Sequence, residues 1–111
     1  TELGLQNQVT TFTGSEFGRT LSSNGDGSDH GWASHHFVMG GAVAGGQIYG
    51  RVPLPVMGGS DDVGQGRYIP DVSVEQLAWP LAKWFGVPDA DLYLVLPTLA
   101  RFDENALKIM R

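Results

Sequence analysis

Cysteine is absent from the 111-residue sequence, which excludes disulfide bonds and thiolate metal sites and leaves the redox compartment open. No apolar run approaches the roughly 18–20 residues that span a bilayer. Basic residues are few, because seven Lys and Arg stand against twelve Asp and Glu, which gives a formal net charge of −5. This charge argues against nucleic acid or an anionic membrane surface as the main partner. We therefore expect neither nucleic-acid binding nor a membrane span.

Glycine, in contrast, is abundant and unevenly distributed. Fourteen of the sixteen glycines lie between Gly14 and Gly66, and only Gly86 follows them. The middle of the chain is therefore predicted to consist of loops and tight turns, and the last third to hold the regular helices. The length allows at most one domain, with the hydrophobic content of a globular protein. Such an uneven distribution is what we expect of part of a larger domain.

Four stretches follow from the local patterns. The first contains a helix tail or turn and then a short strand, Val9–Thr13, whose β-branched and aromatic residues predict burial on both faces. Short strands are also expected around Phe37–Met39 and Gln47–Tyr49. The predicted stretches are 1–13 (helix tail and strand), 14–50 (site loops and short strands), 51–72 (an irregular loop) and 73–111 (C-terminal helices).

The clearest helix signal begins at Ser73. Ser73 and Gln76 have the spacing of a capping box, and apolar residues recur every four positions up to Phe85. Gly86 supplies the stop, while Pro80 inside the pattern predicts a kink. A helical turn capped by Asp89 and a final short helix over Asp103–Met110 are expected to follow.

A cluster of polar side chains is the main candidate for chemistry. All three histidines, His30, His35 and His36, fall within seven residues, and Asp29 and Glu16 are close in sequence. Imidazole and carboxylate together suit zinc, iron or manganese, and a glycine-rich loop lets such ligands converge. The alternative is a polar surface loop with incidental histidines. Adjacent residues of an extended chain point to opposite sides, so at most one of His35 and His36 is expected to face the site.

Two further residues follow the first predicted strand directly. Glu16 and Arg19 lie where ligands bind in open α/β sheets, outside the carboxyl end of a strand. An arginine fork can bind a phosphate or sulfate group through two hydrogen bonds. The alternative role of Arg19 is structural, in an ion pair with Glu16 or Asp26 that fixes a long loop over Thr20–Gly31.

Several motifs resemble one bacterial family. They are Ser15-Glu-Phe-Gly-Arg-Thr20, Gly27-Ser-Asp-His30, the glycine-rich Phe37–Gly50, and Ser73-Val-Glu-Gln with the later Leu-Ala-Lys-Trp-Phe-Gly-Val-Pro88. The chain resembles domain-of-unknown-function family 1501, of the alkaline phosphatase and sulfatase superfamily. The resemblance implies an α/β fold, with a mixed, mainly parallel sheet, flanking helices and long glycine-rich loops. Members of the family are exported by the twin-arginine route and are several times longer, which implies that this chain is the C-terminal part of such a protein.

The resemblance also implies a site. The superfamily places two metals at the carboxyl ends of its sheet, where they can bind the attacking and departing oxygens of a phosphoryl or sulfuryl group. On one mapping Asp29 and His30 bind one metal and His36 binds the other. On a second mapping Glu16 is a ligand of the first metal, and Asp29 and His30 serve the second. The nucleophile comes from the N-terminal half of such proteins, so this chain is not expected to catalyse a reaction alone.

The sequence thus leads to one prediction of function and one alternative. The chain is predicted to be the metal-binding C-terminal portion of a periplasmic or extracytoplasmic hydrolase acting on phosphate or sulfate esters. Its cofactors would be divalent metal ions, in the first place zinc, with manganese, iron or calcium as alternatives. Its partners would be the N-terminal half of the same protein and a small anionic ester, with Arg19 as the catalytic residue. The alternative is a non-catalytic binding or scaffold module of the same fold.

Overall fold

A computed structural model describes residues 2–111 of the chain. The chain divides into two compact units, each assembled from separate segments. Unit 1 contains the N-terminal residues to Thr11, Val38–Gly50 and Val72–Arg111, and unit 2 contains Phe12–Phe37 and Arg51–Asp71. No helix within residues 2–111 is long and apolar enough to cross a membrane.

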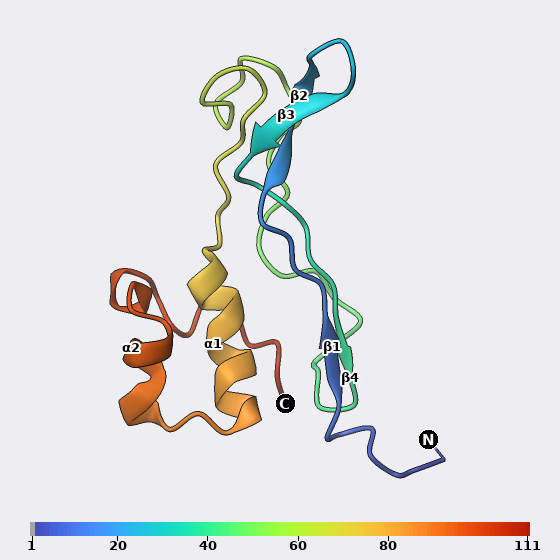
Figure 1. Cartoon of the computed structure of the whole chain (residues 1–111), viewed down its shortest axis with the longest axis vertical. Helices are drawn as coiled ribbons and strands as arrows, with labels where there is room; N and C mark the ends of the chain where they lie inside the picture. The colour runs from blue at the N-terminus through green and yellow to red at the C-terminus, as the bar shows by residue number, and fades with distance from the viewer. Residues whose placement is uncertain (1) are drawn as a thin grey trace. The chain divides into compact units, whose positions relative to one another are not determined.

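The elements follow in order along the chain (Figure 1). Two short sheets are present in residues 2–111, one pairing β1 with β4 and the other pairing β2 with β3. The helical elements all lie in the last third of the chain, as the distribution of glycine predicts. The bounds are β1 Thr10–Phe12, β2 Gly18–Ser23, β3 Ser28–Gly31, β4 Val38–Gly40, α1 Val74–Phe85, the 3-10 helix η1 Asp89–Asp91, α2 Leu92–Val95 and the 3-10 helix η2 Leu99–Arg101.

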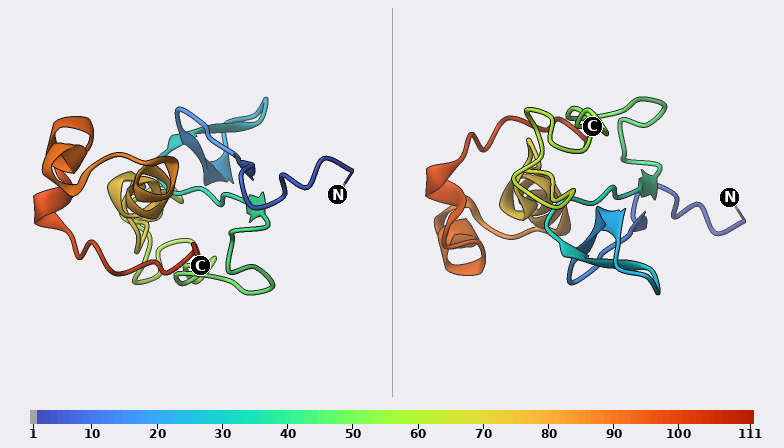
Figure 2. Two further views of the ribbon diagram at one scale, coloured as in Figure 1. Left: turned by 90° about the horizontal axis from the view of Figure 1, so that it is seen from below. Right: turned by 90° about the horizontal axis from the view of Figure 1, so that it is seen from above.

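The helix α1 confirms the strongest local prediction. The Ser73 hydroxyl accepts from the backbone N–H of Gln76, and the Gln76 side chain accepts from the backbone N–H of Ser73. Gly86 ends the helix in the left-handed region, with φ of 106°, which a side chain would disfavour. Pro80 lies within the helix and does not break it. Figure 2 shows α1 and α2 side by side in both views.

The core of unit 1 is small. Leu81 of α1 packs with Leu107 and Ile109 of the C-terminal segment, and Leu92 and Leu99 are fully buried. The Gln76 side chain also donates to the Asp103 carbonyl oxygen at 2.8 Å, which ties the C-terminal segment to α1. Hydrophobic burial of this kind provides most of the stability of a small helical unit.

Residues 2–8 form turns, with the Gln8 N–H bonded to the Leu5 carbonyl oxygen, so of the two alternatives predicted there the turn is found and the helix tail is not. Two other predictions for unit 1 are wrong. Asp103–Met110 forms no helix: residues 104–106 make a turn, and the backbone at Ile109 and Met110 pairs with the chain around Val43 in place of helical bonds. Gln47–Tyr49 forms no strand, since the Gln47 side chain donates to the Ala44 carbonyl oxygen and to the Tyr49 hydroxyl and folds the segment back on itself.

The strand β1 is shorter and more exposed than predicted. It covers Thr10–Phe12, and within the described residues Val9 and Phe12 are each 57% exposed. Its only ladder partner in this part of the chain is β4. The expected burial on both faces is therefore not found in residues 2–111. The mainly parallel sheet implied by the resemblance stays a prediction.

Unit 2 contains an antiparallel hairpin where a long loop was predicted. In it, β2 pairs with β3 in the register Gly18 with Gly31, Arg19 with His30 and Ser23 with Ser28. The turn between the strands is closed by a bond of 3.0 Å from the Asn24 N–H to the Gly27 carbonyl oxygen. The turn chemistry of Thr20–Gly31 is therefore confined to the short connection Asn24–Gly27, and the flanking residues are strands.

The loop Arg51–Asp71 is ordered by two aspartates. Asp62 accepts from the backbone N–H groups of Gly58, Gly64 and Gly66, and the Gly58 bond is the main reason that the pKa of Asp62 is lowered. The Gly66 carbonyl oxygen accepts from the Leu21 N–H at 2.9 Å, which fixes the loop against β2. Asp61 instead faces a cation.

That cation is Arg51, which joins two carboxylates. Arg51 lies 2.7 Å from Asp61 and 2.9 Å from Asp71, and both distances join a guanidinium nitrogen to a carboxylate oxygen. The Arg51 hydrogen bond and the Leu54 N–H lower the pKa of Asp61 to about 2 from its usual 3.8. Arg51, Asp61 and Asp71 thus form an internal ion-pair network that closes the loop.

This network predicts a pH dependence. The folded-state pKa of Asp61 lies below its unfolded value, so its stabilising effect is complete above the unfolded pKa of 3.8 and is lost as the pH falls through about 2. Arg51→Met should remove that effect. The urea midpoint of the variant should therefore fall less between pH 5 and pH 2 than that of the wild type. Arg101→Met, which changes an exposed arginine of η2, is the control. Parallel pH profiles for all three proteins would contradict the prediction.

Candidate functional site

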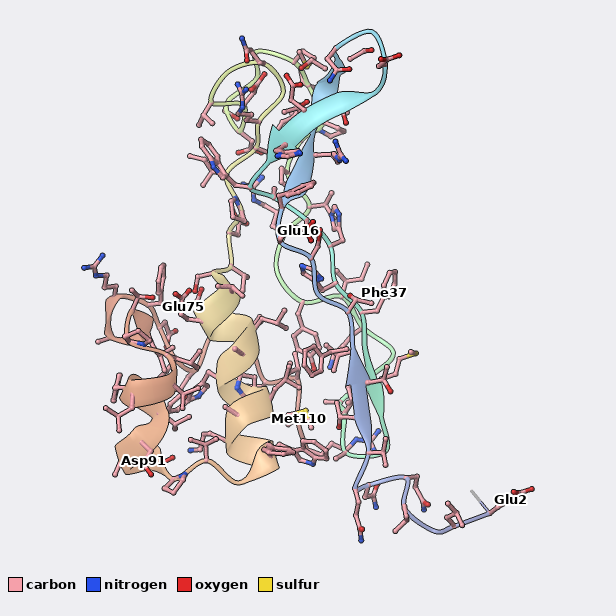
Figure 3. The ribbon with its side chains drawn as sticks, viewed as in Figure 1. Glu2, Glu16, Phe37, Glu75, Asp91 and Met110 are labelled. Carbon is pink, nitrogen blue, oxygen red and sulfur yellow. The ribbon has the colours of Figure 1, made fainter. Side chains whose placement is uncertain are left out.

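A hollow of about 300 Å³ lies at the open end of the β2–β3 hairpin. Residues from both sides of the hairpin line it, namely Glu16, Phe17, His30, Gly31 and Trp32. Glu16 occupies the bend before β2 and is labelled there in Figure 3. The Ser15 hydroxyl donates to the Phe17 carbonyl oxygen at 2.9 Å and fixes this bend. Two of the predicted site residues, Glu16 and His30, therefore share one hollow.

An aromatic ring forms the wall of this hollow. The rings of Phe17 and His30 are stacked, with centroids 3.7 Å apart and an angle of 15° between their planes. The Arg19 guanidinium carbon lies 5.1 Å from the centroid of the same Phe17 ring. The imidazole and the guanidinium thus both use Phe17 as their support, because the face of an aromatic ring favours other planar rings and attracts cations. The stacking leaves the edge of the imidazole, where its nitrogen atoms lie, free of the Phe17 ring.

Arg19 is held by the hairpin itself. Its Nη1 atom donates to the Ser28 carbonyl oxygen at 2.8 Å. Ser28 lies on β3, two residues before His30, which is the ladder partner of Arg19. No ion pair joins Arg19 to an acidic residue in the part of the chain that the structure describes, so the alternative pairing with Glu16 or Asp26 is not found. One hydrogen bond to a carbonyl leaves the other guanidinium N–H groups available for an anion.

Asp29 belongs to a different network. Its backbone N–H donates to the Thr20 hydroxyl at 3.0 Å, and its carboxylate accepts from the Asn24 side chain at 2.9 Å. Because Asp29 and His30 are adjacent on β3, their side chains point to opposite faces of the hairpin. Asp29 therefore fixes the turn, whereas His30 lines the hollow.

His36 lies near the end of the segment Phe12–Phe37, beside Thr13 at its beginning. Its Nδ1 atom is 3.2 Å from the Thr13 hydroxyl, which also accepts from the Phe37 N–H at 2.9 Å. His35 is exposed and shares in no hydrogen bond among those found in residues 2–111. His36 rather than His35 is thus the histidine with a defined structural partner.

The predicted metal ligands do not meet at one centre. No group of three or more His, Asp or Glu side chains within residues 2–111 is arranged to hold a metal ion. Glu16 and His30 share the hollow, and Asp29 and His36 lie elsewhere. A catalytic zinc site needs three protein ligands. The chemistry of Glu16 and His30 fits a metal, but these two residues alone supply only part of its ligands.

Three residues with structural roles at the site were not predicted from the sequence. Phe17 supports His30 and Arg19, the buried Thr20 hydroxyl bonds the Asp29 N–H, and Gly66 lies against β2 where a side chain would meet the backbone. A signal for Phe17 existed, since residues 17 and 19 of an extended chain share one face. Gly66 gave no local signal, because its neighbour in space, Leu21, is far away in sequence.

Comparison with known proteins gives one match. The family described as "Protein of unknown function (DUF1501)" matches residues 1–94. No curated protein and no solved structure matches the chain. The matched part includes the hairpin, the hollow, the ion-pair network around Arg51 and the whole of α1. The chain therefore belongs to the DUF1501 family, whose function is unknown.

Proposed function

We propose that this chain is the metal-binding portion of an exported hydrolase that acts on phosphate or sulfate esters. The observation that carries the proposal is the hollow in which Glu16 and His30 lie together beside the Phe17 support of Arg19. A carboxylate, an imidazole and a guanidinium in one place are suited to a site for a metal and an oxyanion. The motif resemblance to the alkaline phosphatase and sulfatase superfamily supports the same proposal.

Each residue has a separate role in this proposal. Glu16 and His30 would supply two ligands of a divalent metal, in the first place zinc, and a bound metal would polarise the ester oxygen. Arg19 would bind the anionic group of the substrate and stabilise the charge that develops on it. Asp29 and His36 would act as ligands only with donors from another part of the protein. The nucleophile would also come from the N-terminal half of the protein, which is the proposed partner.

The fold and the location are parts of the same proposal. An alkaline-phosphatase-like domain would supply the parallel sheet that covers the exposed apolar residues near the site, such as Phe37 and Trp32. Export by the twin-arginine route would place the protein in the periplasm or outside the cell. Both statements depend on the resemblance.

A second candidate function is a non-catalytic binding or scaffold module. It is favoured by the bonding of the predicted ligands, since Asp29 is bonded to Asn24 and His36 to Thr13. In such a module these side chains would stabilise turns, and Arg19 would fix the hairpin through Ser28. The two candidates differ in what a change at Arg19 does.

Arg19→Lys in the intact protein is the deciding experiment. As a hydrolase, the variant should lose about 10-fold or more of kcat/KM toward p-nitrophenyl phosphate or sulfate, because a fork of donors is replaced by a point charge. Its melting temperature should change little, since lysine can keep the contact with Phe17. His30→Ala should lower the metal content, measured by elemental analysis, while the circular dichroism spectrum is kept. Arg101→Lys is the control for loss of an exposed arginine.

The opposite pattern would support the scaffold. In that case Arg19→Lys should lower the melting temperature, and neither phosphate nor sulfate should raise it in the wild type. A wild-type protein that hydrolyses neither ester in the presence of zinc or manganese, and whose metal content is the same with His30→Ala, would contradict the hydrolase proposal.

A further inference from the structure

A second concave surface lies in unit 1, apart from the candidate site. It is a groove of about 410 Å³ between α1 and the C-terminal segment Glu104–Arg111. Figure 3 shows this segment, with Met110 labelled, beside α1. We call it the tryptophan groove, since Trp79 and Trp84 line it together with Lys83, Lys108 and Met110. Its volume is in the range of small-molecule sites.

One wall of the tryptophan groove is a face of α1. Residues four apart on a helix are neighbours on its surface, so Trp79 lies next to Lys83 and Pro80 next to Trp84. The Lys83 Nζ atom is 5.1 Å from the centroid of the Trp79 ring and 3.1 Å from an Asp89 carboxylate oxygen. The wall therefore presents aromatic surface next to an ammonium group that is paired with Asp89.

The opposite wall is the C-terminal segment, which hydrogen bonds to the chain around Ala44 and Tyr49 hold in place. The Ile109 carbonyl oxygen accepts from the Ala44 N–H at 2.8 Å, and the Lys108 carbonyl oxygen accepts from the Tyr49 hydroxyl at 2.9 Å. Leu107 and Ile109 are buried against Leu81 of α1. The backbone that carries the Lys108 side chain is thus fixed before any ligand arrives, and a preformed wall lowers the ordering cost of binding.

The lining of the tryptophan groove holds more basic than acidic side chains, namely Lys83, Lys108 and Arg111 against Glu104. The protein has a net charge of −5 and only two lysines, and both of them line the groove. Lys83 is paired with Asp89, whereas no ion pair of Lys108 is found within residues 2–111. Lys108 is therefore the cation that would chiefly attract an anion to this groove.

We propose that the tryptophan groove binds a small molecule that combines a planar apolar ring with an anionic group. The ring would pack on the indole surfaces of Trp79 and Trp84. The anion, a carboxylate, sulfonate or phosphate, would lie between the Lys83 and Lys108 ammonium groups. This site lies entirely within unit 1 and is independent of the proposed hydrolase site, which lies in unit 2.

Three probes separate the contributions of ring and charge. They are naphthalene-2-sulfonate, the neutral 2-naphthalenemethanol, and methanesulfonate, which has the anion without the ring. Binding to the full chain is measured by isothermal titration calorimetry. Naphthalene-2-sulfonate should bind at least about 10-fold more tightly than either of the others, because only it engages both the indoles and the ammonium groups. Equal affinity for the neutral probe would overturn the proposal, and so would equal affinity for methanesulfonate.

Fluorine NMR of 5-fluorotryptophan protein locates the binding. The chain has three tryptophans, and Trp32 lines the hollow of unit 2, so its resonance reports any separate binding of the sulfonate there. Naphthalene-2-sulfonate should shift the resonances of Trp79 and Trp84, and these shifts should saturate at the dissociation constant measured by calorimetry. A shift confined to Trp32 would place the probe in the other hollow and overturn the proposal.

Lysine variants provide the matched test of charge. Lys108→Met keeps the aliphatic chain and should weaken binding of naphthalene-2-sulfonate about threefold or more, with no effect on 2-naphthalenemethanol. Lys83→Met should do the same, although it also removes the pair with Asp89. Arg101→Met removes a cation of the same unit outside the groove and should leave the affinity unchanged. Unchanged binding by Lys108→Met, with wild-type Trp79 and Trp84 resonances as proof of folding, would overturn the proposal.

Discussion

Replacing Leu92 by alanine is expected to lower the free energy of unfolding by about 2–5 kcal/mol. Leu92 is 0% exposed and begins α2, which packs against α1. Removing its branched side chain takes away buried apolar surface and leaves a cavity that a small unit can refill only in part. The measurement is a urea titration followed by tryptophan fluorescence, because Trp79 and Trp84 of α1 report on unit 1.

The same helix supplies the control for Leu92. Leu94 lies two residues further along α2 and is 80% exposed, so Leu94→Ala should change the stability by no more than about 0.5 kcal/mol. Both variants have the same chemical change and nearly the same helix propensity. Equal losses at the two positions would mean that the packing of α2 against α1 is not what stabilises unit 1.

A single methyl group at Gly18 should have an effect of comparable size in unit 2. Gly18 begins β2 and is buried, and a Cβ atom placed on it would overlap the carbonyl group of Ala33. The neighbour is backbone and cannot move aside by a change of rotamer. Gly18→Ala should therefore cost about 3 kcal/mol or more and displace the start of the hairpin, from which Phe17 and Arg19 project. Hydrogen exchange of the β2 and β3 amides measures this loss directly.

Gly14→Ala is the matched control for Gly18. A methyl group on Gly14 would have no atoms within 4 Å, and the φ of Gly14 is not left-handed, so the change should be nearly neutral. Gly25 would be a poor control, because its φ of 98° disfavours alanine whatever the surrounding space. If Gly18→Ala exchanges its hairpin amides no faster than Gly14→Ala does, the close approach of Ala33 to β2 is wrong.

Helix α1 shows what can be predicted from local sequence. Its beginning, its apolar face and its end each depend on residues within a few positions of one another, from Ser73 to Gly86. These signals act before any tertiary contact forms, which is why the capping box and the glycine stop are both confirmed. Asp103–Met110 shows the limit, since its bonds to the chain around Val43 come from residues in the first half of the chain and override a weak helical pattern.

The hairpin was mistaken for a loop because its residues are small and polar. Thr20, Ser22, Ser23 and Ser28 have turn-like chemistry, and the strand character comes from pairing and from the loop carbonyl of Gly66. The Asn24-Gly25 pair, a common hairpin turn, was the signal that could have placed the turn. Composition alone could not show how short the turn is.

The candidate site was predicted in part. Asp29 and His30 are adjacent on β3 and point to opposite faces, as is expected for His35 and His36, and for this reason Asp29 and His30 do not converge. Glu16 and His30 do share a hollow, and the common face of residues 17 and 19 indicates that Phe17 can support Arg19, whereas the stacking of Phe17 on His30 depends on pairing across the hairpin. Membership of the DUF1501 family is confirmed, and the superfamily, the metals and the export route stay predictions.

Unit 2 consists of two segments, Phe12–Phe37 and Arg51–Asp71, and in each of them the two ends lie close together. The Thr13 N–H bonds the Phe37 carbonyl oxygen at 3.0 Å at the base of the first, and Arg51 bonds Asp71 at the base of the second. A segment whose ends are held together can change its length at little cost to the stability of the rest of the protein, because each doubling of loop length adds only about 0.6 kcal/mol to the free energy of loop closure. A change in the length of either segment is therefore expected to leave the packing of unit 1 intact, which makes unit 2 the part of the chain that best tolerates insertions and deletions.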